Sequence, residues 1–144
     1  MASEIILQRL RLFLLALALF MFGGSLIELS LINHFQSAVQ LIPFGLAAVG
    51  MLALIWVLIQ SSQLSIQILR LTMAAASFGS AFGVYEHIAH NLAFELDIRP
   101  NAVARDVLFE ALSGASPLLA PGILGMAAVI ALAATYYHPK LTSK

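Results

Sequence analysis

Polar side chains that could bind a metal ion or carry protons are concentrated between residues 85 and 110. His87, Asn91 and Glu95 follow one another at intervals of four residues, so they share one stripe if this segment is helical. Imidazole and carboxylate groups at such spacing can bind a divalent metal ion, relay protons or form a hydrogen-bonded ladder. The segment is therefore the first candidate for a functional site.

A second stripe of the same kind lies beside the first one. Glu86 and His90 are four residues apart, but their sequence E-H-x-x-H lacks the i, i+4 histidine pair of the zinc motif H-E-x-x-H. The metal signature is therefore incomplete, and a structural polar network or a docking face is the favoured explanation. Glu86, His90 and Glu110 are expected at most to orient the ligands of a site.

Two candidates come from the first part of the chain. Glu28 lies about one turn inside the end of an apolar stretch, where an ionised group costs ~2.5 kcal/mol or more at mid-bilayer and less near the interface. His34 follows just beyond that stretch, and two histidines at one depth on two helices could ligate a b-type haem. A metal site at this end of the molecule would use Glu28, His34, His87, Asn91 and Glu95.

The elements that must position these residues are membrane-spanning helices. The chain is 61% hydrophobic and only 10% charged, with a mean hydropathy of +0.97, whereas soluble domains carry about 25% charged residues. Its apolar runs are continuous rather than alternating, which favours helices over a closed barrel. We expect one all-α transmembrane domain over residues 1–144, a bundle of four helices over residues 10–32, 39–59, 66–87 and 115–137.

The connection between the third and fourth spans, residues 88–114, is expected to be a helical cap on the outer end of the bundle. Pro100 disfavours helix in the residue before it and should end the extension of the third helix. Asn101 could then cap a short helix over residues 102–112, lying along the membrane surface. The apolar face of that helix would consist of Val103, Val107, Leu108 and Ala111.

The charged residues predict an orientation and exclude some functions. Five of the seven basic residues fall on the side of both termini, which predicts cytoplasmic termini, a multi-pass protein of the cell inner membrane, and a periplasmic segment 88–114. A net charge of zero without a basic cluster gives no sign of nucleic-acid binding. Because the chain has no cysteine, disulfides, thiolate catalysis and thiolate metal sites are excluded.

Several segments together resemble a family of small bacterial four-span membrane proteins to which no reaction is assigned. They are residues 26–34 (LIELSLINH), 40–43 (QLIP), 83–87 (GVYEH), 91–95 (NLAFE), 109–117 (FEALSGASP), 120–122 (APG) and 137–139 (YHP). The resemblance implies a four-helix inner-membrane protein with polar residues at its outer end. The family pattern falls on Glu28, His34, Gln40, Pro43, Tyr85, His87, Asn91, Glu95, Glu110, Pro117 and Pro121, and it does not include Glu86 or His90.

Two functions follow as expectations. The first is a non-catalytic accessory subunit that binds lipid and other membrane protein subunits through its helices and its polar outer cap. The alternative is a protein that binds a divalent metal ion or a b-type haem at the outer end of the bundle. An enzyme is disfavoured because no serine has the flanking glycines of a nucleophile elbow. A transporter is disfavoured because polar residues do not continue through the spans.

Overall fold

The computed structural model describes residues 2–142, and this part of the chain is helical with no strand. Its elements are α1 (Ala2–Leu31), α2 (Ala38–Ile59), α3 (Gln63–Ile98), the 3-10 helix η1 (Ala104–Val107), α4 (Leu108–Leu112), α5 (Leu119–Ala134) and α6 (Pro139–Thr142). Within this range, α1, α2 and α3 are long and apolar enough to cross a membrane, and α5 is a shorter apolar helix. The all-helical class is thus confirmed and the three long apolar helices are consistent with a membrane protein, while the four-helix membrane bundle and a crossing by α5 stay predictions.

The helices begin and end where local chemistry dictates. The Ser37 hydroxyl accepts a hydrogen bond from the backbone N–H of Gln40 at the start of α2, and Ser62 and Ser65 form a reciprocal cap at the start of α3. Helix α3 ends at Ile98, two residues before Pro100, as predicted. The third predicted span and the helix expected beyond it are therefore one uninterrupted helix of 36 residues.

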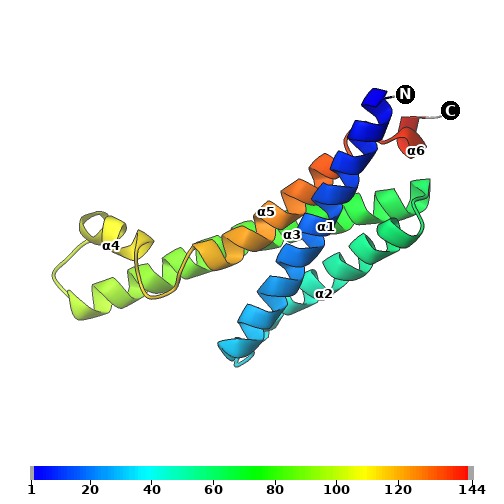
Figure 1. Ribbon diagram of the computed structural model, residues 1–144. Coiled ribbons are helices and arrows are strands. Elements are labelled where there is room, and N and C mark those ends of the chain that lie inside the picture. The colour runs from blue at the N-terminus through cyan, green and yellow to red at the C-terminus, as the bar shows by residue number, and fades with distance from the viewer. Residues whose placement is uncertain (1, 143–144) are drawn as a thin grey trace.

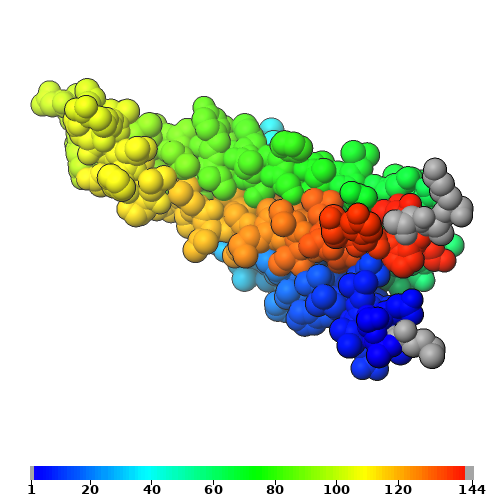
Figure 2. All heavy atoms as spheres, turned by 90° about the horizontal axis from the view of Figure 1, so that it is seen from above, coloured from blue at the N-terminus to red at the C-terminus, as the bar shows by residue number. Residues whose placement is uncertain are grey.

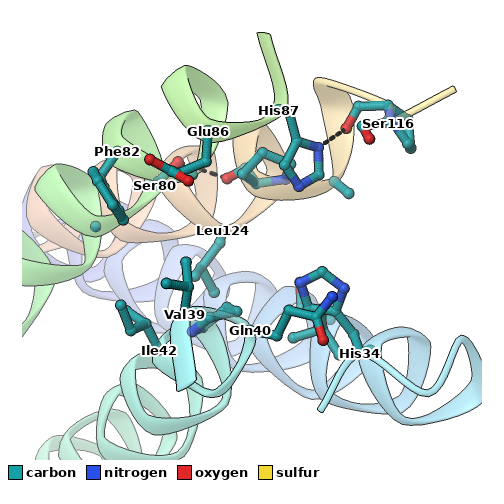
Figure 3. A pocket seen from close by; sticks show the side chains of 18 of the residues that line it. His34, Val39, Gln40, Ile42, Ser80, Phe82, Glu86, His87, Ser116 and Leu124 are labelled. Carbon is teal, nitrogen blue, oxygen red and sulfur yellow. Dashed lines mark hydrogen bonds between the residues drawn. The ribbon is translucent and has the colours of Figure 1, made fainter. Parts of the chain in front are cut away.

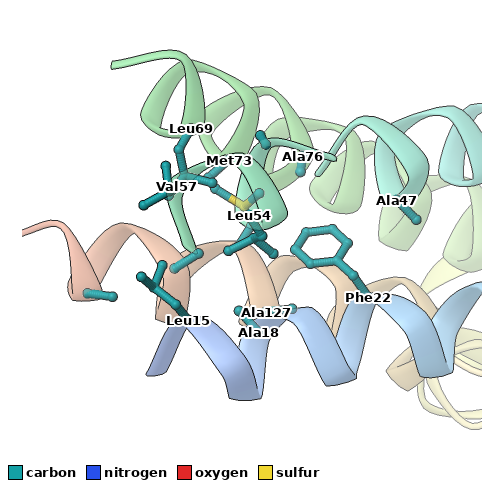
Figure 4. Packing of buried hydrophobic residues seen from close by; sticks show 14 of the residues in the cluster. Leu15, Ala18, Phe22, Ala47, Leu54, Val57, Leu69, Met73, Ala76 and Ala127 are labelled. Carbon is teal, nitrogen blue, oxygen red and sulfur yellow. The ribbon is translucent and has the colours of Figure 1, made fainter. Parts of the chain in front are cut away.

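The apolar faces of α1, α2, α3 and α5 meet in one core, which we call the helical body. Phe22 from α1, Leu54 from α2 and Met73 from α3 are fully buried there, next to Ala127 of α5 (Figure 4). Two glycines let the helices approach closely. A Cβ atom on Gly79 would clash with Leu46 of α2, and one on Gly83 would lie 3.0 Å from the Pro121 Cβ of α5. This G-x-x-x-G pair serves packing within the chain.

The two ends of the helical body differ. The N-terminus, the α2–α3 turn and α6 lie together at one end (Figure 1). At the other end the α1–α2 hairpin diverges from α3 and α5, and α3 continues far beyond the turn of that hairpin. Residues 88–114, which we call the outer arm, form an elongated projection that also dominates one end of the space-filling view (Figure 2).

The structure corrects three details of the prediction. Helix α5 covers Leu119–Ala134 rather than residues 115–137, because residues 113–118 form a loop and the chain turns at Thr135. The helix expected over residues 102–112 is instead η1 followed by the short α4, and Asp106, not Asn101, accepts the hydrogen bond from the Val103 N–H. Among the described residues, η1 and α4 pack on α3 and do not cover α1 or α2.

The apolar face predicted for the outer helix is only half correct. Val107 and Ala111 are buried, whereas Val103 and Leu108 are exposed. The cause is the break between η1 and α4, which changes the helical register that the prediction assumed.

Candidate functional site

A cavity of about 660 Å³ lies where the α1–α2 hairpin diverges from α3 and α5. Its walls include the ends of α1 and α2, the middle of α3, the loop before α5 and the first turns of α5. Figure 3 shows side chains of the α1–α2 hairpin on one side of the space and side chains of α3 on the other. We call α3 and α5, which are joined by the outer arm, the second hairpin. The volume falls within the range of small-molecule sites, about 300–1,000 Å³.

Two histidines face each other across this cavity. The ring centroids of His34 and His87 are 6.5 Å apart, with 56° between the ring planes (Figure 3). The His87 Nδ1 atom lies 2.9 Å from the Pro117 carbonyl oxygen. Because a carbonyl only accepts, this contact requires a proton on Nδ1, so in the neutral ring it is Nε2 that carries the lone pair. The bond therefore fixes both the tautomer and the orientation of His87.

His34 lies in the loop after α1 and is partly buried. Its pKa is lowered from the ordinary 6.5, first because burial disfavours the charged ring and second because of the charge of His87. At neutral pH His34 is therefore predominantly uncharged.

Two carboxylates line the same cavity from opposite walls. Glu28 comes from the last two turns of α1, and Glu86 comes from α3 beside His87. Among the described residues, neither side chain has an arginine, lysine or histidine nitrogen within 4.0 Å. His90 and Gln40 complete the polar lining, with the Gln40 Oε1 atom accepting the Gln36 N–H at 2.7 Å.

Asn91 does not belong to the cavity but holds the outer arm. Its side chain is buried, and its Nδ2 donates to the carbonyls of Ala111 and Ser116 at 2.9 Å each. Its Oδ1 accepts the Ser116 N–H, also at 2.9 Å. Gly114 lies so close that a Cβ there would come within 2.5 Å of the Asn91 side chain. Asn91 thus clamps the loop between α4 and α5 onto α3.

Glu95 belongs to an ion-pair group in the same arm. Arg99 lies 3.6 Å from the Glu95 carboxylate and 3.1 Å from that of Glu110, and it joins the end of α3 to α4. The pKa of Glu110 is held below its ordinary value, first by a hydrogen bond to its own backbone and then by the Arg99 guanidinium. The Arg99 and Glu110 side chains are 47% and 42% exposed, so this pair contributes little stability.

The five predicted metal ligands are therefore split between two places. Glu28, His34 and His87 line the cavity, while Asn91 and Glu95 hold the arm. Glu86 and His90, which were expected only to support a site, line the cavity as well, and Glu110 pairs with Arg99. Among residues 2–142, no group of three histidine, aspartate or glutamate side chains is placed to hold a metal ion.

The histidine pair suits a b-type haem only in part. Two imidazole nitrogens on opposite sides of a cavity are the ligands that such a haem requires. Haem also carries propionate carboxylates, however, and the charged groups that line this cavity besides its histidines are the carboxylates Glu28 and Glu86. The charge of the lining therefore disfavours haem, and its binding stays a prediction.

Sequence reasoning missed the groups that fix these side chains. The Pro117 carbonyl orients His87, and both backbone groups of Ser116 bind Asn91. Backbone groups leave no signal in side-chain types, although the small residues of the segment 113–117 (SGASP) are typical of a loop that another element approaches closely. Comparison of the chain with family models, curated proteins and solved structures finds no match.

Proposed function

We propose that the chain is a non-catalytic membrane subunit that joins a larger membrane complex, and that the outer arm is its docking element. The observation that carries the proposal is a set of exposed apolar side chains, which we call the docking ridge, on an arm that projects beyond the helical body. Its members are Phe94, Ile98, Val103, Leu108, Phe109 and Leu112, and Phe109 is the most exposed at 82%.

The length of α3 supports a position of this ridge outside the hydrocarbon layer. A helix of 36 residues is ~54 Å long, whereas the hydrocarbon core is ~30 Å thick and requires ~20 residues. About 16 residues of α3 therefore extend beyond the layer when the helix stands upright. Apolar side chains in that position are exposed to water unless a partner or the headgroup region covers them.

The internal bonds of the arm also support a docking role. Asn91 and Arg99 hold the loop and α4 against α3, so the ridge has a fixed shape before any partner binds. A preformed surface loses less conformational entropy on association than a flexible one. The polar residues that were candidates for metal ligands, Asn91 and Glu95, are used to build this shape.

The experiment compares two phenylalanines of equal exposure. Phe109 lies in the arm and is 82% exposed, while Phe78 lies in the middle of α3 and is 79% exposed. The native chain and the variants Phe109→Ala and Phe78→Ala are extracted from their own membranes in mild detergent, and the mass of each particle is measured by native electrophoresis after brief cross-linking. We expect a complex with native protein and with Phe78→Ala, and a free chain with Phe109→Ala.

Two results would contradict the proposal. One is a native chain that migrates alone with its detergent. The other is an equal loss of the complex in both variants, which would assign the contact to the lipid-facing helices rather than to the arm.

A further inference from the structure

The cavity between the two hairpins has a property that docking does not use, namely the charge of its lining. Besides its three histidines, the lining carries two carboxylates, Glu28 and Glu86, and no lysine or arginine. In the outer arm, by contrast, Glu95, Glu110 and Asp106 each have an arginine within 4.0 Å. Within residues 2–142, three carboxylates of the exposed arm thus have cationic partners, whereas the two that line the cavity have none.

Besides the two carboxylates, some other polar groups of the cavity also accept hydrogen bonds, while the Gln40 amide, whose Oε1 is used by the Gln36 N–H, has N–H donors. The Nδ1–H of His87 is used by the Pro117 carbonyl, so its Nε2 offers a lone pair. The Ser80 hydroxyl, which could donate to a ligand, donates instead to the Pro121 carbonyl. Burial lowers the pKa of His34, which disfavours a positive charge on this ring. A ligand that carries positive charge is therefore favoured over an anionic one.

The rest of the lining is apolar. The α1–α2 hairpin contributes Leu29, Ile32 and Leu46 to this lining. The second hairpin contributes Phe82 and Leu124. A hydrated inorganic ion would make no favourable contact with these apolar surfaces. The described residues also offer no cluster of three ligands that could replace the water molecules bound to such an ion. An organic cation with bulky apolar substituents matches both kinds of surface. Phe82 adds an aromatic ring, which attracts cations through its face.

We propose that this cavity binds a lipophilic organic cation, with its charged centre between Glu28 and Glu86 and its apolar substituents against the aliphatic walls. The ligand class is an amphiphile with an ammonium or phosphonium centre. We expect the ligand to enter where the α1–α2 hairpin diverges from α3 and α5 (Figure 1). The site is separate from the docking ridge, so its test does not depend on that function.

The first test uses two probes of the same shape and opposite charge. Tetraphenylphosphonium and tetraphenylborate are titrated calorimetrically into the unaltered protein in an uncharged detergent, with empty micelles as the blank. We expect saturable binding of about one tetraphenylphosphonium per chain and only unsaturable partition of tetraphenylborate. Equal binding of both probes would overturn the proposal, because it would show apolar partition without recognition of charge.

The second test removes the charges one at a time. Glu28→Gln and Glu86→Gln are each expected to weaken tetraphenylphosphonium binding by about tenfold, the loss of one charge-assisted contact of ~1.4 kcal/mol. Asp97→Asn is the matched control, because Asp97 is an exposed carboxylate on the same helix as Glu86 and lies outside the cavity. It should leave the affinity within twofold. Native affinity in either glutamine variant, or an equal loss in the control, would overturn the assignment.

Discussion

Asn91 and Ser116 are joined by two antiparallel hydrogen bonds, in which the Asn91 Nδ2 donates to the Ser116 carbonyl and the Ser116 N–H donates to the Asn91 Oδ1, each at 2.9 Å. A side-chain amide thus pairs with a backbone in the manner of a neighbouring strand. In its third hydrogen bond Asn91 donates to the Ala111 carbonyl, so it also holds the end of α4 against α3. One side chain therefore makes all three of these hydrogen bonds between α3 and residues 111–116.

Replacement of Asn91 by alanine should loosen the arm without unfolding the helical body. It leaves two buried carbonyls and one N–H unpaired, at a cost of about 1–3 kcal/mol per unsatisfied group. We expect faster amide exchange and easier proteolysis of residues 108–118, with α1 and α2 unchanged. Asn101→Ala, at an exposed turn residue of the same arm, is the control and should change neither. Equal exchange in both variants would mean that Asn91 is not the clamp.

His34 should titrate below its ordinary pKa of 6.5, and His87→Ala should move that pKa part of the way back. Burial is the larger cause of the lowering and the His87 charge the smaller, so the return is incomplete. Because the folded pKa is lowered, the stability tied to neutral His34 is present above pH 6.5 and decreases as the pH falls through the folded value. NMR of the protons on the His34 ring carbons measures the His34 pKa in the native chain and in His87→Ala. A His34 pKa above 6.5 would refute the expectation.

Two glycines of the helical body should respond in opposite ways to the same substitution. Gly79→Ala forces the Leu46 side chain to move and should destabilise the protein by about 1–3 kcal/mol. Gly24→Ala meets no atom within 4 Å and should be neutral or slightly stabilising, because alanine favours helix over glycine by about 1 kcal/mol. Thermal unfolding in detergent compares the two. A similar loss in both would show that close contact at Gly79 is unimportant.

Single cysteines test the number of crossings and the orientation, and the absence of native cysteine makes the background clean. Ser61, in the α2–α3 turn, lies at the end that holds both termini, and Asn101 lies in the arm at the other end (Figure 1). We expect an impermeant maleimide to label Asn101→Cys in intact cells and Ser61→Cys only after lysis. The reverse pattern would invert the orientation, and equal labelling of both would deny that α3 crosses the membrane.

The sequence alone predicts the helices better than the site, and the reason is physical. Apolar runs, the serine caps and Pro100 act within a few residues, so α2 and the ends of α1 and α3 lie close to their predicted bounds, whereas α1 begins at Ala2 rather than at residue 10. The partners of Asn91 are backbone groups 20 and 25 residues away, which composition does not reveal. The stripe of His87, Asn91 and Glu95 exists, but each member faces a different neighbour.

The contact of His34 with His87 depends on the relative orientation of two helical elements, which local sequence patterns do not reveal. It requires the angle at which the α1–α2 hairpin diverges from α3, two parts of the chain that approach closely where Gly79 meets Leu46. The same angle brings Glu86 into the cavity lining and leaves Glu95 in the arm. Helical spacing alone could not separate these two carboxylates.

The short α5 has a consequence for the lipid around the protein. With 16 residues it is ~24 Å long, about 6 Å less than the hydrocarbon layer that α1 and α3 match easily. Its Leu119, Met126 and Val129 side chains are exposed, so the described part of the chain does not cover this face. If α5 crosses the membrane, the bilayer must become locally thinner on that side of the protein alone. Such hydrophobic mismatch would tilt the protein, gather short-chain lipids beside α5 and favour residence in thin membranes.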